Sequence, residues 1–480
     1  MNGNSQVRSS SFSLQAVIMV KTLLVLLTCS SFAAPAPGLL QMFDGTSIHG
    51  TLESISTNQG VAWAFPAAQG PLVLRPDNIS GIRFESVVTT NRENKPTCRF
   101  RFHNGDEVLG NLIGIDNENA TIESWFGGQL KAPKQSFSSL QFAAHGFKVV
   151  YEGPNGPNEW KTGRTGHGWT YKDGALIANG ADILGRDFGL TNSSSLEFDL
   201  AWTGTFSLTV TVYAQTIERF DYSTSAYVFY LNPGSVSIQR IQAGAGAMML
   251  GRADIPEMLA KNRARMEIRS NREEGTLSLF FNGALVQRWR DTRGFVSNGT
   301  GVVFYSQVES PTLKLSNIKL SEWDGRFEPE ISTTNKLRED VVFLGNRDKV
   351  VGKVKGLNET KLLVQTRTLE SGTAPPEGSV DEGRVLQIPL ARVTEIYFAN
   401  TEASTAKQSP WAVRASFPGG ESVSFLLEKW TAGEVTGLSG NFGPVAFNPR
   451  AIRFLQFNPS RIDLKSDEDV DNDWIPELNE

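Results

Sequence analysis

Residues 263–289 read RARMEIRSNREEGTLSLFFNGALVQRW and contain short alternating segments joined by two turns. In 263–271 and again from 276, apolar residues fall at every second position, which is the period of a strand with one buried face. The turns are NREEG (271–275) and NG (282–283), and Asn-Gly between two apolar runs is a strong hairpin signal. The stretch therefore predicts consecutive antiparallel strands.

The same pattern continues on both sides of this stretch, over residues 145–325. The other segments are EWKTGRTGHGWTYKDGALIANG (159–180), SSLEFDLAW (194–202), TFSLTVTVYA (205–214), GVVFYSQ (301–307) and PTLKLSNIKLSEW (311–323). Strands at about ten-residue spacing with no long helical pattern predict a two-sheet sandwich or jelly roll.

Composition agrees with an all-β chain of several domains. The 480 residues are 40% hydrophobic and 20% charged, with 45 glycines and 29 phenylalanines. That length exceeds one ordinary domain. The net charge of −5 is spread over interspersed residues, so no basic face predicts a nucleic-acid partner.

Four copies of one pattern flank the middle domain. Each opens with a Phe, a turn and alternating apolar residues: FDGTSIHGTLESI (43–55), FHNGDEVLGNLIGI (102–115), FLGNRDKVVGKVKGL (343–357) and FPGGESVSFLLEKW (417–430). Each closes with a Pro and an apolar triplet: Ile79, Ile82, Phe84; Phe137, Leu140, Phe142; Val393, Ile396, Phe398; Ile452, Leu455, Phe457. We expect small curved antiparallel sheets that pack in pairs, because about forty residues bury too little core alone.

The predicted architecture is therefore a central two-sheet jelly-roll sandwich (145–325) flanked by pairs of small β-barrel-like repeats (43–142 and 341–458). The repeats resemble Sm-like small barrels. They serve either as protein-binding assembly modules or as a frame for the middle domain. The third copy carries an insertion, TLESGTAPPEGSVDEGR (368–384), typical of a loop.

The middle domain also resembles a known family. Its segments GWTYKDGALIANG, LEFDLAW, RMEIRSNREEGTLSLFFNGALVQRW and LSNIKLSEW are similar to the concanavalin A-like jelly roll of laminin-G and 3-keto-disaccharide hydrolase type domains. The resemblance implies an exported protein. It leaves function open, because such domains include sugar-binding modules, glycosidases and proteins of no known activity.

Candidate site residues are few in the middle domain. Glycoside hydrolysis needs two carboxylates flanking one bond, and the candidates are Glu197 and Asp199. They lie two apart on one predicted strand, so they share a face, and a solvated outer face is the simpler interpretation. Sugar binding needs aromatic faces and planar polar groups. For a ligand-facing set we select Trp160, Trp169, Arg219 and Tyr222.

The N-terminus predicts export. Residues 22–28, TLLVLLT, follow Lys21 and precede small residues, which predicts a signal peptide over 1–33 cut before Ala34. The true start is Met1 or Met19, and lipidation at Cys29 stays an alternative to plain cleavage. After cleavage only Cys98 remains, so no intrachain disulfide forms and a bacterial source is favoured. The mature chain would be periplasmic, cell-surface or extracellular, with no transmembrane segment.

The C-terminal stretch DVDNDWIPELNE (469–480) has the ligand spacing of a calcium loop. The six positions are Asp469, Asp471, Asp473, Ile475, Glu477 and Glu480. The stretch resembles a thrombospondin type 3-like calcium repeat, although Trp474 stands where such a loop needs Gly. The alternative for 463–480 is a solvated acidic tail.

Three functions follow. The favoured one is an exported noncatalytic binding or scaffold protein whose jelly roll binds carbohydrate or another surface polymer, with protein partners on the small repeats. The alternatives are a glycan-active hydrolase of the 3-keto-disaccharide hydrolase type and a purely structural envelope protein.

Overall fold

A computed structural model describes residues 36–44, 46–85, 96–143, 147–163, 168–307, 313–325, 327, 337–366, 384–399 and 409–459. The chain divides into two units, Met1–Ala33 and Ala34–Glu480, and all described residues belong to the second. The predicted signal peptide and the acidic tail lie outside the described residues.

The fold class is all-β, as predicted. In the described residues the helical elements are six short 3-10 turns: η1 (Pro76–Asn78), η2 (Lys134–Ser136), η3 (Pro157–Glu159), η4 (Pro256–Ala260), η5 (Leu390–Arg392) and η6 (Pro449–Ala451). A membrane-spanning helix would need to be longer and more apolar than any helix in these residues.

The middle domain, called the jelly roll below, has two antiparallel sheets. The eight-stranded sheet follows the order β13 (Trp169–Lys172), β14 (Ala175–Ala178), β25 (Leu313–Glu322), β16 (Ser193–Trp202), β21 (Arg263–Asn271), β22 (Thr276–Phe281) and β23 (Ala284–Arg290), with β11 (Val149–Gly153) also on β25. The seven-stranded sheet follows the order β12 (Lys161–Thr162), β15 (Asp182–Asp187), β24 (Gly301–Ser306), β17 (Leu208–Ala214), β18 (Ala226–Asn232), β19 (Ser235–Gln242) and β20 (Gly246–Asp254).

The core of the jelly roll lies between these sheets. Phe198 of β16, Met266 of β21 and Phe304 of β24 are fully buried in one apolar cluster. Their neighbours along each strand point outward, as a period of two requires. Because β16 and β21 are paired with Glu197 opposite Glu267, the charged positions of both strands lie on the same outer face.

Each small repeat has five strands, and the quoted opening and closing patterns span mainly the second and the fifth of them. Repeat 1 is β1 (Ala36–Met42), β2 (Ser47–Ser56), β3 (Gly60–Ala64), β4 (Leu72–Leu74) and β5 (Ile79–Phe84); repeat 2 is β6 (Cys98–Phe102), β7 (Glu107–Ile115), β8 (Asn119–Ser124), β9 (Gly128–Pro133) and β10 (Phe137–Phe142). Repeat 3 is β26 (Asp340–Leu344), β27 (Lys349–Asn358), β28 (Lys361–Gln365), β29 (Val385–Pro389) and β30 (Val393–Tyr397); repeat 4 is β31 (Ala412–Phe417), β32 (Glu421–Trp430), β33 (Val435–Ser439), β34 (Gly443–Phe447) and β35 (Phe454–Phe457). The first, third and fourth strands of each repeat lie mostly outside these patterns.

The closing halves of the repeats are alike in structure. A 3-10 turn begins at or directly after the proline in each copy. A strand begins at the next residue in repeats 1 to 3 and three residues after the end of the turn in repeat 4. All members of the four apolar triplets except Phe142 are buried in one cluster. Phe142 is only half-buried.

The repeats form two pairs, and each pair joins an N-terminal repeat to a C-terminal one. Strand β5 of repeat 1 pairs antiparallel with β35 of repeat 4, with Ile82 opposite Leu455. Strand β10 of repeat 2 pairs with β30 of repeat 3, with Leu140 opposite Ile396. In both pairs equivalent triplet residues face each other, so the two members are related by an approximate two-fold axis.

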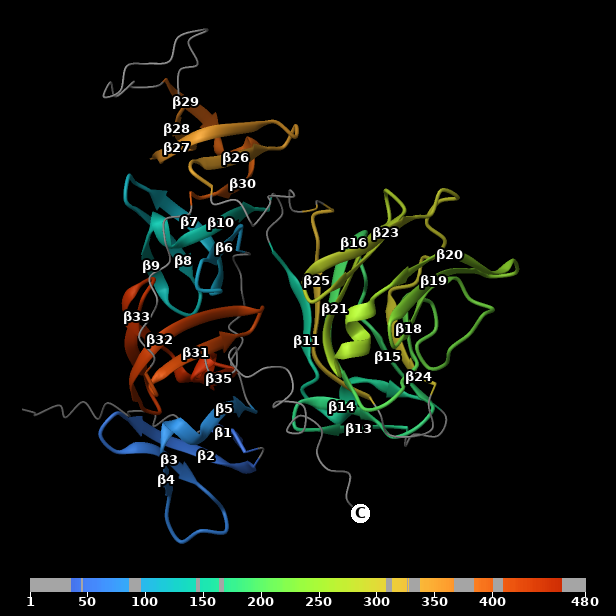
Figure 1. Cartoon of the computed structure of the whole chain (residues 1–480), viewed down its shortest axis with the longest axis horizontal. Helices are drawn as coiled ribbons and strands as arrows, with labels where there is room; N and C mark the ends of the chain where they lie inside the picture. The colour runs from blue at the N-terminus through green and yellow to red at the C-terminus, as the bar shows by residue number, and fades with distance from the viewer. Residues whose placement is uncertain are drawn as a thin grey trace, which may run out of the picture. The chain divides into compact units, whose positions relative to one another are not determined.

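A second approximate two-fold interface joins the pairs through repeats 4 and 2. Glu421 accepts a hydrogen bond from Leu109 N at 3.2 Å and one from Trp125 Nε1 at 2.8 Å. Reciprocally, Asp106 accepts one from Ser424 N at 3.0 Å. Both carboxylates are buried. The four repeats therefore stack in the order 1, 4, 2, 3 (Figure 1), and this stack is called the column below.

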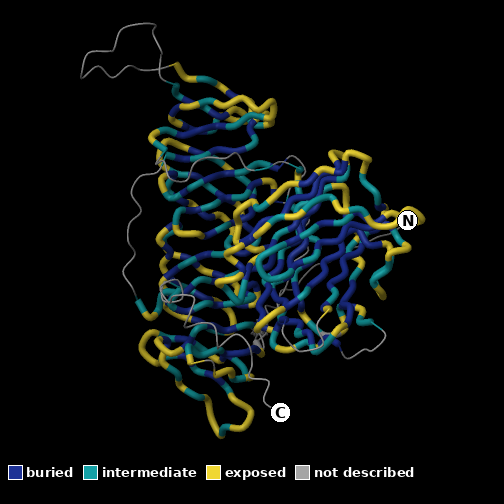
Figure 2. The backbone as a smooth tube through the Cα atoms, turned by 45° about the vertical axis from the view of Figure 1, so that its right-hand side comes forward, coloured by how far each residue is buried: buried dark blue, intermediate teal, exposed yellow. Residues whose placement is uncertain are grey.

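The jelly roll is fastened to the column by polar contacts. Glu152 accepts a hydrogen bond from Gly419 N at 2.7 Å and pairs with Arg453 at 2.9 Å. Gly420 has φ +82, and a Cβ on it would lie 2.6 Å from Lys319 Nζ. The positive φ favours glycine there, whereas the Lys319 side chain could move aside for a Cβ. Figure 2 shows that the strand centres of both parts are buried while exposed residues gather at loops and at the ends of the column.

Candidate functional site

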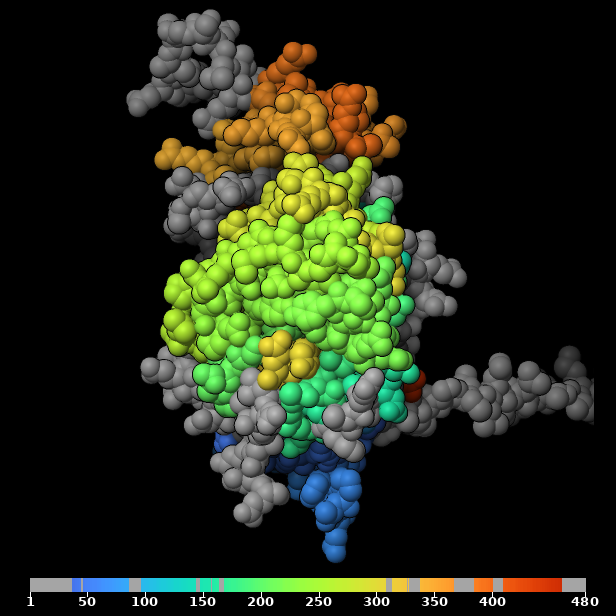
Figure 3. Space-filling model, turned by 90° about the vertical axis from the view of Figure 1, so that its right-hand side faces the viewer, coloured from blue at the N-terminus to red at the C-terminus, as the bar shows by residue number. Residues whose placement is uncertain are grey.

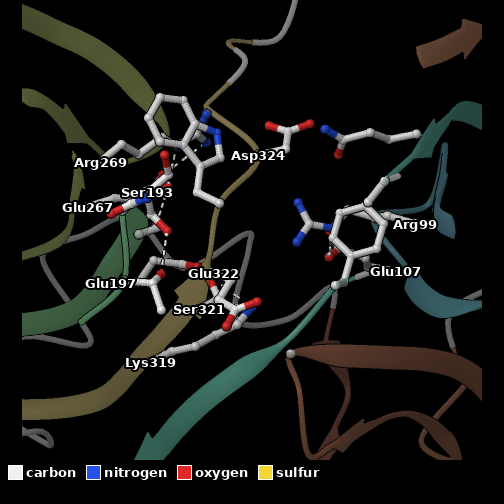
Figure 4. Close-up of a pocket in the computed structure, with 18 of the residues that line it drawn as sticks. Arg99, Glu107, Ser193, Glu197, Glu267, Arg269, Lys319, Ser321, Glu322 and Asp324 are labelled. Atoms are coloured by element: carbon white, nitrogen blue, oxygen red, sulfur yellow. Dashed lines mark hydrogen bonds and ion pairs between the residues drawn. The ribbon is translucent and has the colours of Figure 1, made fainter. Parts of the chain in front are cut away.

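A polar pocket lies between the outer face of the eight-stranded sheet and repeat 2. Its volume is about 1020 Å³, at the upper end of the range for ligand pockets. The lining includes six cationic side chains (Arg99, Arg101, Arg265, Arg269, Arg272, Lys319) and five acidic ones (Glu107, Glu197, Glu267, Glu322, Asp324). Figure 4 shows Glu197, Glu267 and Lys319 on one side and Arg99 and Glu107 on the other.

The jelly-roll wall is a set of ion pairs on adjacent strands. Arg265 donates to Glu197 at 2.7 Å and to Asp199 at 2.9 Å. Arg269 donates to Glu267 at 2.6 Å. Alternation along β16 and β21 turns all these side chains away from the core and toward repeat 2.

The repeat wall has its own paired charges. Glu107 at the start of β7 lies 3.1 Å from Arg99 Nε and 3.4 Å from Arg101 Nε. Both arginines lie on β6, two residues apart, so they share one face of the strand. The guanidinium of Arg99 also lies 4.6 Å from the ring of Phe147.

The two walls influence each other electrostatically. Burial alone would raise the pKa of Glu197, but Lys319, Arg265 and the more distant Arg99 lower it to about 2. Burial alone would likewise raise the pKa of Glu107, yet Arg99 and Arg101 hold it below its ordinary value. Both carboxyls are therefore ionised at neutral pH.

The depressed pKa of Glu197 predicts a specific loss of stability in acid. Its folded pKa lies below the ordinary 4.5, so the ionised form stabilises the fold above about pH 4.5, and this contribution disappears as pH falls toward 2. At about 1.4 kcal/mol per pH unit, the carboxylate contributes roughly 3 kcal/mol. We therefore expect the unfolding free energy of Glu197→Gln, measured by urea titration, to fall less than that of the wild type as pH is lowered from about 4.5 toward 2. Parallel curves for the two proteins would contradict this, and Glu257→Gln at an exposed position is the control.

An acceptor on the repeat wall has no hydrogen-bond partner among the described residues. Gln141 Oε1 is buried and forms no hydrogen bond with another described residue. A buried acceptor without a donor costs free energy, so a donor from a bound molecule would be favoured here. Half-buried Trp323 and Phe142 add apolar surface to the same pocket.

Glu197 does not fit the acid role of a glycosidase. A glycosidase needs one carboxyl with a raised pKa to protonate the leaving group. Glu197 has the opposite shift, and Asp199 is held by Arg265 and by Asn317 Nδ2 at 2.6 Å. The two candidate catalytic carboxylates do share a face, as predicted. The sequence favoured a solvated outer face for these carboxylates. The structure instead places Glu197 in the lining of a pocket that repeat 2 closes on the other side.

The predicted ligand-facing set is divided by the structure. Trp160 and Trp169 are 4% and 5% exposed and belong to the core between the sheets. Their indole nitrogens donate to Tyr151 OH and to Asp182 O. The prediction that these two rings face a ligand is wrong, because large aromatics in a sandwich supply its core.

Arg219 and Tyr222 lie elsewhere, between β17 and β18. Both are exposed, and Tyr222 OH lies 2.9 Å from Tyr230 OH. Arg219 pairs with Asp221 at 2.7 Å. Neither lines the interface pocket, so a ligand-binding role for them stays a prediction.

The sequence contains a signal for the two walls of the pocket. Arg265, Glu267 and Arg269 alternate in RARMEIRSN, and Arg99 and Arg101 alternate in CRFRF. Charged residues at every second strand position indicate a polar face with internal ion pairs. These alternating charges do not reveal which part of the chain lies opposite each polar face.

The six predicted calcium ligands, Asp469 to Glu480, lie outside the described residues. Within the described ranges, no group of three or more His, Cys, Asp or Glu side chains is arranged to hold a metal ion. Calcium binding by the C-terminal stretch stays a prediction.

No family model and no curated protein matches this sequence. Among solved structures, the carbohydrate-binding module CBM66 from Bacillus subtilis is 12% identical, with a TM-score of 0.24, over 37% of this chain and 95% of that one. The potassium-bound Emp46p carbohydrate recognition domain is 12% identical, with a TM-score of 0.29, over 37% of this chain and 98% of that one. A Bacillus subtilis protein of unknown function with a galectin-like fold is 9% identical, with a TM-score of 0.28, over 37% of this chain and 97% of that one. At these values the similarities support no functional assignment, and the site rests on the geometry of this chain.

Proposed function

We propose that this chain is an exported, noncatalytic carbohydrate-binding protein that holds its ligand in the pocket between the jelly roll and repeat 2. The observation that carries the proposal is the unpartnered acceptor Gln141 Oε1 on the wall of a large pocket whose charged groups are largely neutralised in pairs.

The chemistry of the lining supports a sugar over a charged ligand. Six cationic and five acidic side chains leave little net charge, so no single ionic group of a ligand is strongly preferred. Fixed arginines donate while carboxylates and Gln141 accept, which matches hydroxyl groups that do both. The rings of Trp323 and Phe142 offer apolar surface for the C–H faces of a sugar ring.

The column is part of the binding site as well as a scaffold. Repeat 2 supplies Arg99, Arg101, Glu107 and Gln141 to the pocket. The jelly roll alone would present only one wall. Binding experiments must therefore use the intact chain.

The test is a glycan array with the intact protein, followed by calorimetry on each glycan that binds. We expect Gln141→Leu to weaken binding at least about tenfold, since it removes the unpaired acceptor. Glu267→Gln on the opposite wall should weaken it similarly, because Glu267 positions Arg269 and Ser195.

Gln456→Leu is the matched control. Gln456 follows Leu455 in repeat 4 as Gln141 follows Leu140 in repeat 2, but it does not line the pocket. Its binding should equal that of the wild type. Glycan binding that survives both pocket variants would place the ligand elsewhere, and no binding to any glycan would remove the carbohydrate function. Turnover of a 3-keto-glycoside would refute the noncatalytic part of the proposal.

A further inference from the structure

Repeat 3 lies at one end of the column and carries the same docking turn that repeat 2 uses inside it. Residues 344–357 align with 102–115 without a gap, because Val350 pairs with Val342 as Val108 pairs with Phe100. This places Asn346 at the position of Asn104, and Asp348 at that of Asp106. The segments read LGNRDKVVGKVKGL and FHNGDEVLGNLIGI.

The two turns agree in geometry. Asp106 N donates to Asn104 Oδ1 at 3.1 Å, and Asp348 N donates to Asn346 Oδ1 at 3.2 Å. The central residue of each has a positive φ, +81 for Gly105 and +73 for Arg347. A non-glycine residue in this region costs about 1 kcal/mol or more, so repeat 3 keeps the turn at an energetic cost.

The surroundings of the two turns differ. In repeat 2, Asp106 and Leu109 are each 1% exposed, because repeat 4 covers them. In repeat 3, Asp348 is exposed and Val351, at the position of Leu109, is 43% exposed. Figure 3 shows the surface of repeat 3, in orange, at one end and beyond the jelly roll.

The internal interface shows what such a turn needs from its partner. In it, each repeat contributes one buried carboxylate and one backbone N–H three residues later: Asp106 with Leu109, and Glu421 with Ser424. Repeat 3 has both elements in Asp348 and Val351, so it is complementary to itself about a two-fold axis. Repeat 1, at the other end, has Thr46 at the acid position and lacks the carboxylate.

We propose that two copies of this chain associate through repeat 3 about a two-fold axis, with Asp348 of each copy accepting from the Val351 N–H of the other. Isologous contacts of this kind close as dimers. The proposal rests on the equivalence of repeat 3 to repeat 2 and is independent of the carbohydrate pocket.

One residue opposes this association and makes it dependent on salt. Inside the column, Glu107 lies opposite Ser422. The equivalent position in repeat 3 is Lys349, so a two-fold interface brings two lysines together. Like charges opposite each other destabilise paired strands, and salt screens exposed charges. The dimer should therefore tighten as salt rises.

The test is sedimentation equilibrium of the intact chain from micromolar to about 0.1 mM protein, at about 0.1 and about 1 M sodium chloride. We expect a monomer–dimer equilibrium that is tighter at high salt. Asp348→Asn should weaken the dimer at least about tenfold, while Lys349→Ser, which copies Ser422, should tighten it about threefold or more at low salt. Lys131→Ser, at an exposed position of β9, is the matched control and should change nothing.

Each other result overturns the proposal. A monomer at every concentration and salt level removes the interface. Growth beyond the dimer indicates a head-to-tail contact between repeat 3 and repeat 1, because heterologous contacts build larger rings or open filaments and do not stop at two copies. A dimer that Asp348→Asn leaves intact lies on another surface, and unchanged thermal unfolding of this variant shows that its fold is preserved.

Discussion

Replacing Asp291 with asparagine is expected to cost the jelly roll about 3–5 kcal/mol of unfolding free energy, the usual loss when one partner of a buried ion pair is removed. The Asp291 side chain is fully buried, and its Oδ2 accepts from Arg240 Nε and from Tyr227 OH, both at 2.7 Å. Asparagine has one acceptor oxygen where aspartate has two and carries no charge. The guanidinium of Arg240 would therefore stay buried without a counter-charge.

The position of Asp291 explains why the loss should affect the whole sandwich. Asp291 directly follows β23 of the eight-stranded sheet, while Tyr227 and Arg240 lie on β18 and β19 of the seven-stranded sheet. The cluster thus ties the two sheets together.

Asp254→Asn is the matched control for this change. Asp254 forms an exposed pair with Arg252 at 3.3 Å, and exposed pairs contribute little, about 0–1 kcal/mol. Urea unfolding followed by circular dichroism measures both variants. Equal losses would show that the buried cluster does not tie the sheets.

The isosteric change Glu421→Gln is expected to cost the column roughly 2–4 kcal/mol. Glu421 is completely buried and accepts from Leu109 N and Trp125 Nε1 with its two oxygens. Glutamine keeps one acceptor and turns an NH₂ group toward a donor, so one buried N–H loses its partner. The contact between repeats 4 and 2 should weaken while each repeat keeps its own core.

Glu428→Gln tests the same substitution on the same strand, at an exposed position. It should change stability by less than about 0.5 kcal/mol. Urea unfolding followed by tryptophan fluorescence is suitable, because Trp125 lies at the interface. A loss for Glu421→Gln no larger than that for Glu428→Gln would contradict the reciprocal carboxylate contact.

Local patterns predicted the elements of this fold well. The closing triplets mark buried strands, because each follows a 3-10 turn that begins at or next to a proline, and Ile82, Leu140, Ile396 and Leu455 are all buried. The alternation in 263–289 likewise becomes β21, β22 and β23. Both signals are carried by neighbours in sequence.

Long-range choices could not be predicted in the same way. The four closing strands are so similar that each could pair with any other, and sequence does not show why Ile82 meets Leu455 when Leu140 offers similar chemistry. The actual choice depends on contacts such as Asp106 to Ser424, which join residues 318 apart.

The pocket depends on the same kind of information. The alternating charges of β21 and β6 indicate two polar faces, but only the assembled chain brings Glu267 and Arg99 into one cavity. An aromatic ring that could stack on a sugar can also pack in a core, and Trp160 packs against Phe304 and Phe188. Burial decides between the two roles, and burial is a property of the fold.

The nested pairing of the repeats sets an order for folding during synthesis. Repeats 1 and 2 leave the ribosome first, yet the strands that pair with them, β35 and β30, come after the whole jelly roll. Asn458 contacts Pro76 across 382 residues. Until then β5 and β10 present unpaired edges, which readily join foreign strands. The jelly roll has all its strands within residues 149–322, whereas the column needs strands from the last part of the chain. A chain truncated before repeat 3 is therefore expected to contain every strand of the sandwich but to expose the edges of β5 and β10.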